Sequence, residues 1–422
     1  MSDKKKITAP KGTHDILPGE SAVWQKIEDL MRQICGEYGY REIRFPVFEH
    51  TELFNRGVGD TTDVVQKEMY TFEDKGGRSI SLRPEGTASA VRNYIEHSLY
   101  NAPAPVKLYY LITCYRYERP QAGRFREFNQ FGVESFGSPS PATDAEIISL
   151  AMNLLKRLKV EGLTLYLNTI GCTECRKRYN QVLHDYLAQH KDQLCDLCND
   201  RLERNPLRIL DCKNPDCHEV IQQAPTVDQV LCEDCKEHFQ TLLNRLDDIG
   251  IAYEIDHSLV RGLDYYTRTV FEIKSGDLGA QSTVCGGGRY DGLVEQLGGN
   301  PSPGIGFSMG MERLISILEK QGVLPDVTER PQLYLASMGE KAARFAFQAA
   351  DALRSAGLRA EFDHMGKSLK AQMKYADKIG AKYCVVVGED ELASQTAQLK
   401  NMETGEIKEI NLKELLGGKF NG

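Results

Sequence analysis

Four arginines lie close together in one short segment, Tyr115–Gly137, which reads YRYERPQAGRFREFNQFGVESFG. A proline and a glycine among them mark a turn, and the arginines are Arg116, Arg119, Arg124 and Arg126. Because guanidinium groups are permanently charged planar forks that suit phosphate oxygens, this concentration predicts an anionic ligand. The alternative is a solvated strand face with surface ion pairs, although such a face does not need so many aromatic residues beside it.

The same part of the chain predicts a β-hairpin, with strands over Leu108–Glu118 and Phe125–Phe136. Since side chains on a strand alternate between its two faces, Gln130, Gly132 and Glu134 share one face. The glycine between two polar side chains is expected to leave a hollow there. The hairpin is therefore expected to supply both cationic groups and a polar recess.

Further along the chain, Leu259–Ile273 reads LVRGLDYYTRTVFEI and groups Arg261 with two tyrosines before an apolar strand. Cys285–Asp291 (CGGGRYD) and Gly304–Leu314 (GIGFSMGMERL) are rich in glycine, which lets backbone or ligand approach closely. Taken alone, the glycine run is more typical of a β-bulge, and arginine packed with tyrosine is typical of cation–π surface structure. The arginine-bearing segments are explained better together than apart.

Together with RPEGT at Arg83–Thr87, these segments closely resemble the histidyl-tRNA synthetases, a family of class II aminoacyl-tRNA synthetases. The resemblance runs from KGTHDILP at Lys11–Pro18 through the C-terminal region. YRYERP is similar to the second motif of the class, GIGFSMGMERL to the third, and GYREIRFPVFE at Gly39–Glu49 to the first. That first motif forms dimers, so a symmetric homodimer is expected. RPEGT and LVRGLDYY are the segments that indicate histidine among the amino acids.

The resemblance implies a site for ATP. The carboxylate of histidine must attack the α-phosphate, so like charges must be held together and the charge developing on phosphorus must be neutralised. By resemblance, Arg116 and Arg261 are the catalytic residues that hold this phosphate, and Mg²⁺ neutralises the remaining phosphate charge. Arg313 is expected against the adenine ring and the γ-phosphate, with Phe125 on the other adenine face and Glu118 near the adenine amino group.

Specificity for histidine requires hydrogen bonds to both imidazole nitrogens, because a pocket that reads only shape discriminates poorly among amino acids of similar size. The resemblance implies Glu134 and Tyr266 for these bonds, with Tyr265 alongside. It also implies a set of residues that hold the amino and carboxylate ends of L-histidine: Glu85, Gly86, Thr87, Gln130, Arg116 and Arg261.

For the transfer step, the 3′-terminal ribose hydroxyl of tRNA(His) must attack the adenylate. The turn of the hairpin is placed to meet the acceptor end of the tRNA through Arg119, Gln121, Arg124 and Arg126. No side chain stands out as the base of this step, and a phosphate oxygen of the adenylate is the alternative.

The chain length of 422 residues predicts two or three domains. Strands and helices without regular βαβ alternation favour an α+β domain with a mainly antiparallel sheet flanked by helices, over residues 1–170 and 246–325. One of its helices is predicted to open at Thr143, with Glu146 in the capping-box position. A polar, helical and cysteine-rich insertion is expected over residues 171–245.

Residues 331–422 predict a small α/β domain with parallel strands, which resembles an anticodon-binding domain. Its second predicted helix carries a lysine stripe at about 100° per residue, formed by Lys367, Lys370, Lys374 and Lys378. Alone, such a stripe is typical of a solvated face. The resemblance favours contact with tRNA phosphates instead.

Eight of the twelve cysteines lie in the insertion, as the pairs Cys172/Cys175, Cys195/Cys198, Cys212/Cys217 and Cys232/Cys235. CxxC pairs in a cytosolic chain are typical of zinc sites, and disulfides are not expected there. The chemistry of the family does not require a metal in this region, so bound zinc and free thiols stand as alternatives. Zinc here would be structural, because the insertion has little core of its own. Cys35, Cys114, Cys285 and Cys384 are expected to be buried as small apolar side chains.

The formal net charge of −8 argues against a protein that coats nucleic acid through its overall charge, although local basic surfaces remain compatible with it. MSDKKKITAP lacks the apolar stretch of a secretory signal, and no apolar run is long enough to span a bilayer. We therefore expect a cytoplasmic protein without a membrane partner.

Three other functions compete with this interpretation. A synthetase-like regulatory subunit of histidine biosynthesis keeps the fold but lacks the anticodon-binding domain, which this chain is expected to have. A class II synthetase for threonine, proline or glycine is disfavoured by RPEGT and RGLDYY. A zinc-dependent interaction protein would leave the arginine segments unexplained.

Overall fold

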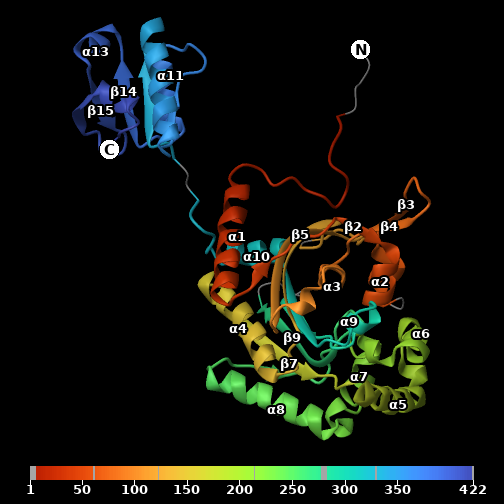
Figure 1. The fold of residues 1–422 in the computed structure, drawn as a ribbon. Coiled ribbons are helices and arrows are strands. Elements are labelled where there is room, and N and C mark those ends of the chain that lie inside the picture. Colours follow the sequence, from red (N-terminus) through yellow and green to blue (C-terminus); the bar gives the residue numbers. More distant parts are fainter. Residues whose placement is uncertain are drawn as a thin grey trace, which may run out of the picture. The chain divides into compact units, whose positions relative to one another are not determined.

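The computed structural model describes residues 6–59, 62–121, 123–212, 214–276, 283–327 and 330–420. The chain folds as two compact units, Met1–Pro325 and Asp326–Gly422. Each unit has hydrophobic cores of its own, and in Figure 1 each is built around its own sheet.

The first unit is built on an eight-stranded sheet with the order β1-β5-β6-β11-β10-β9-β7-β8. The neighbouring pairs from β5 to β7 are antiparallel, and only the two edge pairs, β1–β5 and β7–β8, are parallel. The predicted α+β unit with a mainly antiparallel sheet is confirmed. The strands are β1 (Arg41–Glu42), β5 (Val106–Tyr115), β6 (Glu127–Phe136), β7 (Leu163–Thr169), β8 (Glu254–Ile255), β9 (Thr267–Ser275), β10 (Thr283–Arg289) and β11 (Gly304–Gly310).

Strands β5 and β6 form the predicted hairpin, and their pairing ends at Tyr115 opposite Glu127. Phe131 and Val133 of β6 are fully buried in the main core, as the alternation of side chains requires. Next to the turn, β5 ends at Tyr115 instead of Glu118 and β6 begins at Glu127 instead of Phe125, whereas β5 begins two residues earlier than predicted. Pro120 lies in the intervening turn, where a residue without an N–H cannot extend the ladder.

Four helices pack with one face of this sheet into the main hydrophobic core. They are α1 (Glu20–Glu37), α4 (Pro141–Arg157), α8 (Glu233–Asp248) and α10 (Met311–Lys320), and Figure 1 shows them grouped on that side. On α1, Trp24, Ile27, Met31 and Ile34 recur at helical spacing and are buried, which explains why the segment is an amphipathic helix. Helices α3 (Thr87–Glu96) and α9 (Leu293–Gln296) pack in a second core, which includes Tyr265, Tyr266 and Tyr290.

Helix α4 begins about one turn earlier than predicted. Its N-cap is Ser140, whose side chain accepts a hydrogen bond from the backbone N–H of Ala142, and Pro141 occupies the first helical turn. Proline suits that position because its fixed φ is helical and its missing N–H would have no partner there. The capping box predicted at Thr143 is wrong, and Glu146 forms an ion pair with a lysine of β5 instead.

A three-stranded sheet with the order β2-β4-β3 precedes the RPEGT segment. Arg83, which follows β4, is buried and donates to the backbone carbonyls of Thr113 at 2.7 Å and of Phe45 at 2.9 Å. The small sheet is thereby joined to β5. Its elements are β2 (Phe48–His50), α2 (Thr51–Val58), the π-helical turn η1 (Val64–Glu68), β3 (Thr71–Glu73) and β4 (Ser79–Leu82), and the 3₁₀ turn η2 (Leu99–Asn101) follows α3.

The cysteine-rich segment is helical and has a separate core of leucines, valines, tyrosine and cysteines. Its elements are α5 (Thr173–Gln189), η3 (Lys191–Gln193), α6 (Asp196–Arg204), η4 (Pro206–Ile209), η5 (Pro215–Cys217), α7 (His218–Gln222) and η6 (Val227–Val230). Helix α8 carries Cys235 in that core, whereas Leu242 and Leu246 belong to the main core. One continuous helix therefore joins the two cores (Figure 1).

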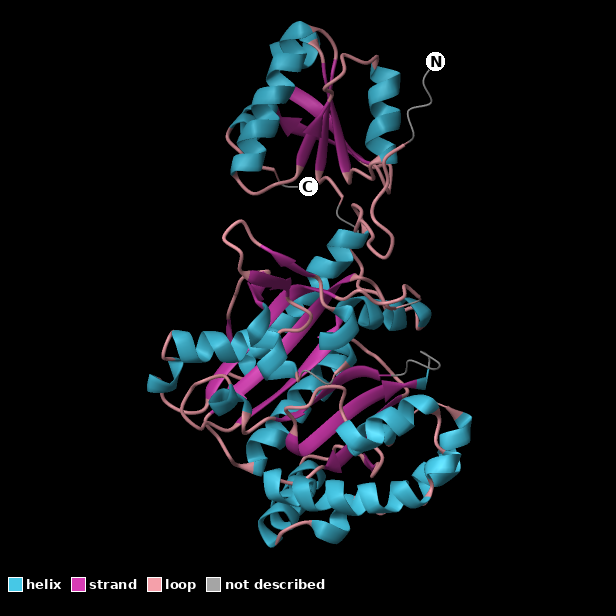
Figure 2. Ribbon diagram, turned by 90° about the vertical axis from the view of Figure 1, so that its right-hand side faces the viewer, coloured by secondary structure: helices cyan, strands magenta, loops and turns pink. Residues whose placement is uncertain are grey.

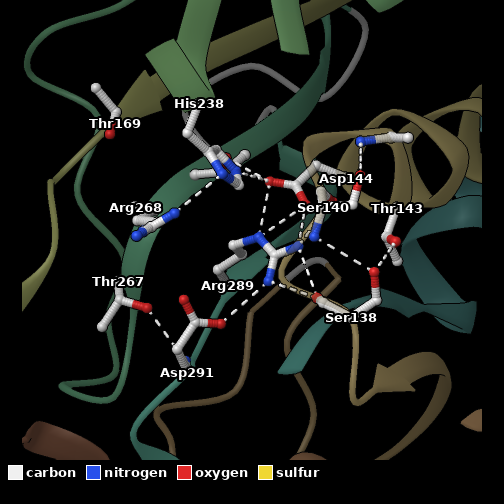
Figure 3. Close-up of polar contacts among 12 residues, drawn as sticks. Ser138, Ser140, Thr143, Asp144, Thr169, His238, Thr267, Arg268, Arg289 and Asp291 are labelled. Carbon is white, nitrogen blue, oxygen red and sulfur yellow. Dashed lines mark hydrogen bonds and ion pairs between the residues drawn. The ribbon is translucent and has the colours of Figure 1, made fainter. Parts of the chain in front are cut away.

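A buried polar network holds α8 against α4 and β10 (Figure 3). Asp144 and Arg289 are fully buried, and their Oδ1 and Nη2 atoms lie 2.7 Å apart. Asp144 Oδ2 lies 2.8 Å from His238 Nε2 and accepts a bond from the Thr269 hydroxyl at 2.7 Å. The other ring nitrogen of His238 lies 3.1 Å from a guanidinium nitrogen of Arg268. Since buried charges are stable only when paired and hydrogen-bonded, these contacts fix the elements against one another.

The second unit has a five-stranded sheet with the order β13-β12-β14-β15-β16 and helices on both of its faces (Figure 2). Strand β12 pairs parallel with β13 and β14, as predicted, but β15 and β16 add an antiparallel hairpin that the sequence patterns did not indicate. The elements are β12 (Leu333–Ser337), α11 (Glu340–Ser355), β13 (Ala360–Phe362), α12 (Leu369–Lys378), β14 (Tyr383–Val387), α13 (Glu389–Ser394), β15 (Thr396–Asn401), β16 (Ile407–Asn411) and α14 (Leu412–Leu416).

Candidate active site

A pocket in the first unit is bounded by the end of the β5–β6 hairpin, strands β10 and β11, and the first turn of α10. Arg116, Arg261 and Arg313, from three distant parts of the chain, all line it. Four other residues predicted for the site also line it: Glu118, Arg124, Phe125 and Gln130. Five lining residues were not predicted: Phe128, Thr283, Gly286, Ser308 and Glu312.

Arg116 is held at the end of β5 by contacts on two sides. Its Nε donates to the carbonyl of Pro84 in the RPEGT segment at 2.8 Å, and its guanidinium lies 5.4 Å from the centre of the Phe128 ring. Its Nη1 lies 3.8 Å from Glu118 Oε1, and Arg124 Nη1 lies 3.2 Å from the other oxygen of that carboxylate. The pocket wall therefore alternates cationic and anionic groups.

Arg261 crosses strand β10 and forms an ion pair with Glu272 of β9. A Cβ atom at Gly286 would come within 2.4 Å of Arg261 Nη1, so the glycine makes room for the guanidinium. Burial works against its charge, but Tyr266 and Glu272 raise the pKa of Arg261 overall. Its Nε atom is buried without a hydrogen-bond partner in the described part of the chain. This leaves a strong donor at the pocket for an anionic ligand.

Arg313 and Phe125 line the pocket on the side of α10. Arg313 donates from Nη1 to the carbonyl of Thr283 at 3.0 Å and from Nε to that of Gly123 at 3.3 Å. Burial and the neighbouring Arg124 lower the pKa of the Arg313 guanidinium from its ordinary value. The ring of Phe125 lies 4.5 Å from that of His14, which comes from the KGTHDILP segment.

Glu85, Gly86 and Thr87 form the start of α3, which explains the spacing of RPEGT. Glu85 is buried, and its two carboxylate oxygens accept from the backbone N–H groups of Thr87 at 2.7 Å and Ala88 at 2.8 Å. These bonds satisfy donors at the helix N-terminus, which otherwise lack partners. Burial raises the pKa of Glu85. A Cβ atom at Gly86 would clash with the ring of Tyr110 at 2.3 Å.

Glu134 is buried and is not among the residues that line the pocket, and it accepts bonds from three hydroxyl groups. Thr87 and Tyr110 donate to Oε1 at 2.8 and 2.9 Å, and Tyr290 donates to Oε2. Burial raises the pKa of Glu134 to about 8, although the hydroxyl bonds oppose the shift. The hollow predicted beside Gly132 is filled, because the Tyr110 ring lies where a Cβ atom would stand.

Tyr265 and Tyr266 are both buried close to Glu134 and Arg261. Their ring centres lie 4.7 Å apart, and the Arg261 guanidinium lies 5.9 Å from the centre of the Tyr266 ring. Burial raises the pKa of both phenols, so both are neutral donors near neutral pH. Tyr290 lies next to this pair, with its ring centre 5.7 Å from that of Tyr265.

Sequence reasoning missed several residues that shape the site. Tyr110 and Glu272 lie within predicted strands, and Tyr290 lies in the glycine-rich CGGGRYD segment. Strand alternation alone does not tell which distant segment a strand residue faces. His14 lies in KGTHDILP, a segment whose residues have no role predicted from the sequence. A buried aromatic hydroxyl usually has a partner, which is the one sequence-level signal that Tyr110 and Tyr290 offer.

The predicted tRNA-binding residues of the hairpin turn differ in exposure. Arg119, Gln121 and Arg124 are exposed. Arg126 is half-buried, with its guanidinium 3.9 Å from the centre of the Tyr117 ring and its Nε bonded to the carbonyl of Glu118. Three of the four thus lie on an accessible surface beside the pocket.

In the second unit, the lysine stripe is exposed but only partly helical. Lys370, Lys374 and Lys378 lie on α12, whereas Lys367 precedes the helix, which begins at Leu369. The predicted four-lysine helical stripe is therefore shorter by one member, although Lys367 is also exposed.

The cysteines fall into two classes. Cys35, Cys114, Cys285 and Cys384 are buried singly, as predicted. The other eight are gathered by the fold into two groups of four, which are Cys172, Cys175, Cys232 and Cys235, and Cys195, Cys198, Cys212 and Cys217. Separately, among the described residues no helix has both the length and the apolar character that a membrane span requires.

Comparison with known proteins identifies relatives over nearly the whole chain. A histidine–tRNA ligase of Acetivibrio thermocellus is 58% identical over 408 residues, which cover 97% of this chain and 98% of that protein. A histidine–tRNA ligase of Caldanaerobacter subterraneus is 56% identical over 407 residues, which cover 96% of this chain and 98% of that protein. The crystal structure of apo S. aureus histidyl-tRNA synthetase superposes with a TM-score of 0.84 at 40% identity, covering 97% of this chain and 99% of that one.

Two family models match the chain, one to each unit. The anticodon-binding domain matches residues 332–418. The histidyl-tRNA synthetase model matches residues 12–314, a range that contains every residue lining the arginine pocket. With this match and relatives more than 50% identical over nearly their full length, the chain belongs to the histidyl-tRNA synthetase family.

Proposed function

We propose that the arginine pocket is where this histidine–tRNA ligase activates L-histidine with ATP, forming histidyl-adenylate and pyrophosphate before transfer to tRNA(His). The observation that carries the proposal is the convergence of Arg116, Arg261 and Arg313 on one pocket. Three guanidinium groups in a partly buried wall form a strongly anion-attracting site, which suits a nucleoside triphosphate.

Arg116 and Arg261 are assigned to the α-phosphate. Both are held by the protein before any ligand arrives, Arg116 through Pro84 and Arg261 through Glu272. Preorganised donors stabilise the charge that develops on the phosphate without a reorganisation cost at the moment of reaction. The buried Nε of Arg261, which has no partner among the described residues, is a natural donor to the phosphate or to the histidine carboxylate.

Arg313 and Phe125 are assigned to the adenine ring and Glu118 to its amino group. His14 lies against Phe125, so it supports the ring that would stack on adenine. Mg²⁺ usually binds through one or two carboxylates together with substrate phosphates. Glu312 lines the pocket and offers such a carboxylate, so the residues present fit the ion. When bound, Mg²⁺ neutralises phosphate charge.

Glu134 and Tyr266 are assigned to the two imidazole nitrogens, with Tyr265 alongside. A carboxylate offers about four lone-pair positions. When Glu134 is ionised, Oε1 accepts two hydroxyl bonds and Oε2 accepts one, so Oε2 retains capacity for an imidazole N–H. The Thr87, Tyr110 and Tyr290 hydroxyls thus orient the carboxylate rather than replace the ligand.

The remaining histidine contacts are assigned to the start of α3 and to β6. Glu85 and Thr87 hold the amino end, with Gly86 leaving space beside Tyr110, and Gln130, which is buried and lines the pocket, reaches the carboxylate end. Each Glu85 oxygen already accepts one backbone N–H, which fixes the carboxylate without exhausting its lone pairs.

The tRNA is assigned to two surfaces. The exposed turn with Arg119, Gln121 and Arg124, together with Arg126, would meet the acceptor end, and Lys367, Lys370 and Lys374 would contact phosphates in the anticodon-binding unit, proposed over residues 331–422. The catalytic domain is proposed over residues 1–170 and 246–325, with 171–245 as its insertion. A homodimer in the cytoplasm, formed through Gly39–Glu49, completes the proposal.

Pyrophosphate exchange measured with each of the twenty amino acids tests the proposed function. We expect ATP–pyrophosphate exchange with histidine alone, because only histidine presents an imidazole to Glu134 and Tyr266. Exchange with threonine, proline or glycine would assign the pocket to another synthetase. The absence of exchange with every amino acid would favour a regulatory paralogue.

A further inference from the structure

The two groups of four cysteines have the geometry of mononuclear metal sites. In the first cluster, Cys172, Cys175, Cys232 and Cys235, and in the second, Cys195, Cys198, Cys212 and Cys217, all four Sγ atoms lie within 4.8 Å of one another. In chain order, the first and fourth cysteine pairs form one cluster, and the second and third pairs form the other. Such convergence of distant pairs is unnecessary for thiols that merely fill a core.

The sulfur separations match a tetrahedral ion. A zinc–sulfur bond of about 2.3 Å in tetrahedral geometry places the sulfur atoms about 3.8 Å apart. The Sγ atoms of Cys172 and Cys175 are 3.6 Å apart, and those of Cys195 and Cys212 are 3.9 Å apart. All twelve cysteines are free thiols, so no disulfide competes for these sulfur atoms.

In the first cluster, backbone N–H groups point at the sulfur atoms in a reciprocal pattern. The N–H of Cys172 donates to Cys235 Sγ at 3.2 Å, and the N–H of Cys232 donates to Cys175 Sγ at 3.1 Å. Cys172 and Cys232 are the N-caps of α5 and α8. N–H donors and helix N-termini both stabilise negative charge, and a metal ligand must be a thiolate.

The second cluster also has backbone N–H groups that donate to its sulfur atoms, although not in a reciprocal pattern. The N–H of Cys195, the N-cap of α6, donates to Cys217 Sγ at 3.2 Å, and the N–H of Asn214 donates to Cys212 Sγ at 3.4 Å. Cys198 and Cys217 are fully buried. Most of the polypeptide around this cluster consists of short helical turns, which pack through buried apolar side chains such as Leu207 and Ile209.

We propose that the cysteine-rich insertion binds two zinc ions, one in each four-cysteine cluster, and that both ions are structural. Four cysteine ligands close the coordination shell and leave no position for a substrate or a reactive water. Soft thiolate ligands in tetrahedral geometry select zinc over Mg²⁺ or Ca²⁺. The two ions then tie the short elements of the insertion to one another and add to the stability that its own hydrophobic core provides.

The first zinc site also bears on the proposed histidine site, which is the part of this inference that rests on the proposed function. Arg176 directly follows the ligand Cys175, and its Nη1 donates to the backbone carbonyls of Asp264 at 2.7 Å and Tyr266 at 3.0 Å. The segment that carries Arg261 and Tyr266 is therefore attached to a residue next to a zinc ligand. Arg176 acts as a positioning residue, since it reaches the backbone of the site from outside.

Metal content of the full-length protein tests the two zinc sites without reference to activity. The chain is purified under reducing conditions without chelator or added metal, and its metals are measured by inductively coupled plasma mass spectrometry. We expect two zinc ions per chain. Iron in these sites, or protein that contains no zinc and takes up none when titrated with ZnCl₂, would overturn the proposal.

Paired substitutions assign each ion to its cluster. Cys175→Ser with Cys235→Ser, and separately Cys198→Ser with Cys217→Ser, should each lower the zinc content from two ions to one. The control is Cys384→Ala, a buried cysteine outside both clusters, which should keep two. A variant that fails to fold leaves the wild-type zinc count as the deciding measurement, and two ions retained in either double variant would contradict the assignment.

Arg176→Ala tests the attachment to the histidine site. It should keep two zinc ions and raise the KM for histidine about tenfold in pyrophosphate exchange, because a misplaced binding segment weakens substrate contacts made far from the substitution. Lys177→Ala, which removes only an exposed side chain paired with Glu174, should leave both quantities unchanged. A normal KM in Arg176→Ala would disprove the attachment, whereas the zinc count stands independently of any loss of exchange.

Discussion

Arg261 lies over the α-carbon of Gly286, so closely that a Cβ atom there would be 2.4 Å from its Nη1 atom. The obstructing group is the far end of a flexible side chain, not backbone. In Gly286→Ala we expect the sheet to persist while the guanidinium is displaced. A displacement of about 1 Å at a catalytic group can cost about 10²-fold in rate, so histidine-dependent pyrophosphate exchange should fall by about that factor.

The matched control is Gly292→Ala, because an added Cβ atom there meets no atom within 4 Å. Both variants should unfold at nearly the wild-type urea concentration, and only Gly286→Ala should lose exchange. Normal exchange in Gly286→Ala would mean that Arg261 either tolerates the shift or takes no part in the reaction.

Arg261→Ala should slow adenylate formation by about 10²–10³-fold without unfolding the protein. Its partner Glu272 keeps a bond from the Thr283 hydroxyl at 2.9 Å and an ion pair with Lys274 at 3.6 Å, so no isolated buried charge remains. Removal of one preorganised donor to a developing charge costs about 10²–10³-fold in kcat. Single-turnover formation of histidyl-adenylate measures this loss directly, and a wild-type rate would exclude Arg261 from the catalytic role.

Glu134 should make the stability of the first unit fall as pH rises. Its folded-state pKa is about 8, above the ordinary value of 4.5, because burial disfavours the charged form. The folded state therefore holds a proton that the unfolded chain releases between these two values, and the contribution is complete below about 4.5 and lost as pH approaches about 8.

The measurement is the urea midpoint of wild-type protein and of Glu134→Gln between pH 5 and pH 8.5. The difference between the two should shift steadily in favour of the glutamine variant as pH rises, since glutamine carries no titrating proton. A constant difference across this range would show that Glu134 is ionised throughout.

Local patterns predicted a large part of this fold, because the hairpin, the helix containing Trp24 and the start of the α/β unit each depend on neighbours in the chain. The failures are also physical. Ser140 and Pro141 outcompete Thr143 as a helix start because a serine cap followed by proline satisfies more of the helix terminus. The expected hollow at Gly132 is filled by Tyr110, a contact that depends on strand register across the sheet.

The candidate site shows the same division. The arginines were recognisable from residue type and motif, but their convergence depends on the packing of β10 and β11 beside the hairpin. The cysteine pairs were visible in the sequence, whereas their partners were not. Only the return of α8 to α5 brings Cys232 and Cys235 to Cys172 and Cys175.

Asp144→Ala should destabilise the first unit strongly. Asp144 and Arg289 are fully buried, and removal of the carboxylate leaves the ring of His238 without its anionic partner and the guanidinium of Arg289 with only the partly exposed Asp291, at 3.1 Å (Figure 3). Breaking a buried ion pair in this way costs about 3–5 kcal/mol. Urea denaturation measures the loss, and Glu174→Ala, which breaks an exposed pair with Lys177, should change stability by less than about 1 kcal/mol. A loss in Asp144→Ala as small as that would show that the network is replaceable.

Charge reversal on α12 should weaken tRNA binding while leaving amino acid activation intact. Lys370 and Lys374 are exposed on one helix, where phosphate contacts would depend on counterion release. In Lys370→Glu with Lys374→Glu, we expect the KM for tRNA to rise about tenfold or more and its salt dependence to become shallower. Pyrophosphate exchange, which needs no tRNA, should be unchanged.

Lys413→Glu on α14 is the control, since it alters net charge at another exposed lysine of the same unit. If both charge changes raise the KM alike, overall charge rather than the α12 stripe governs the encounter, and an unchanged KM in the double variant would remove α12 from the tRNA interface.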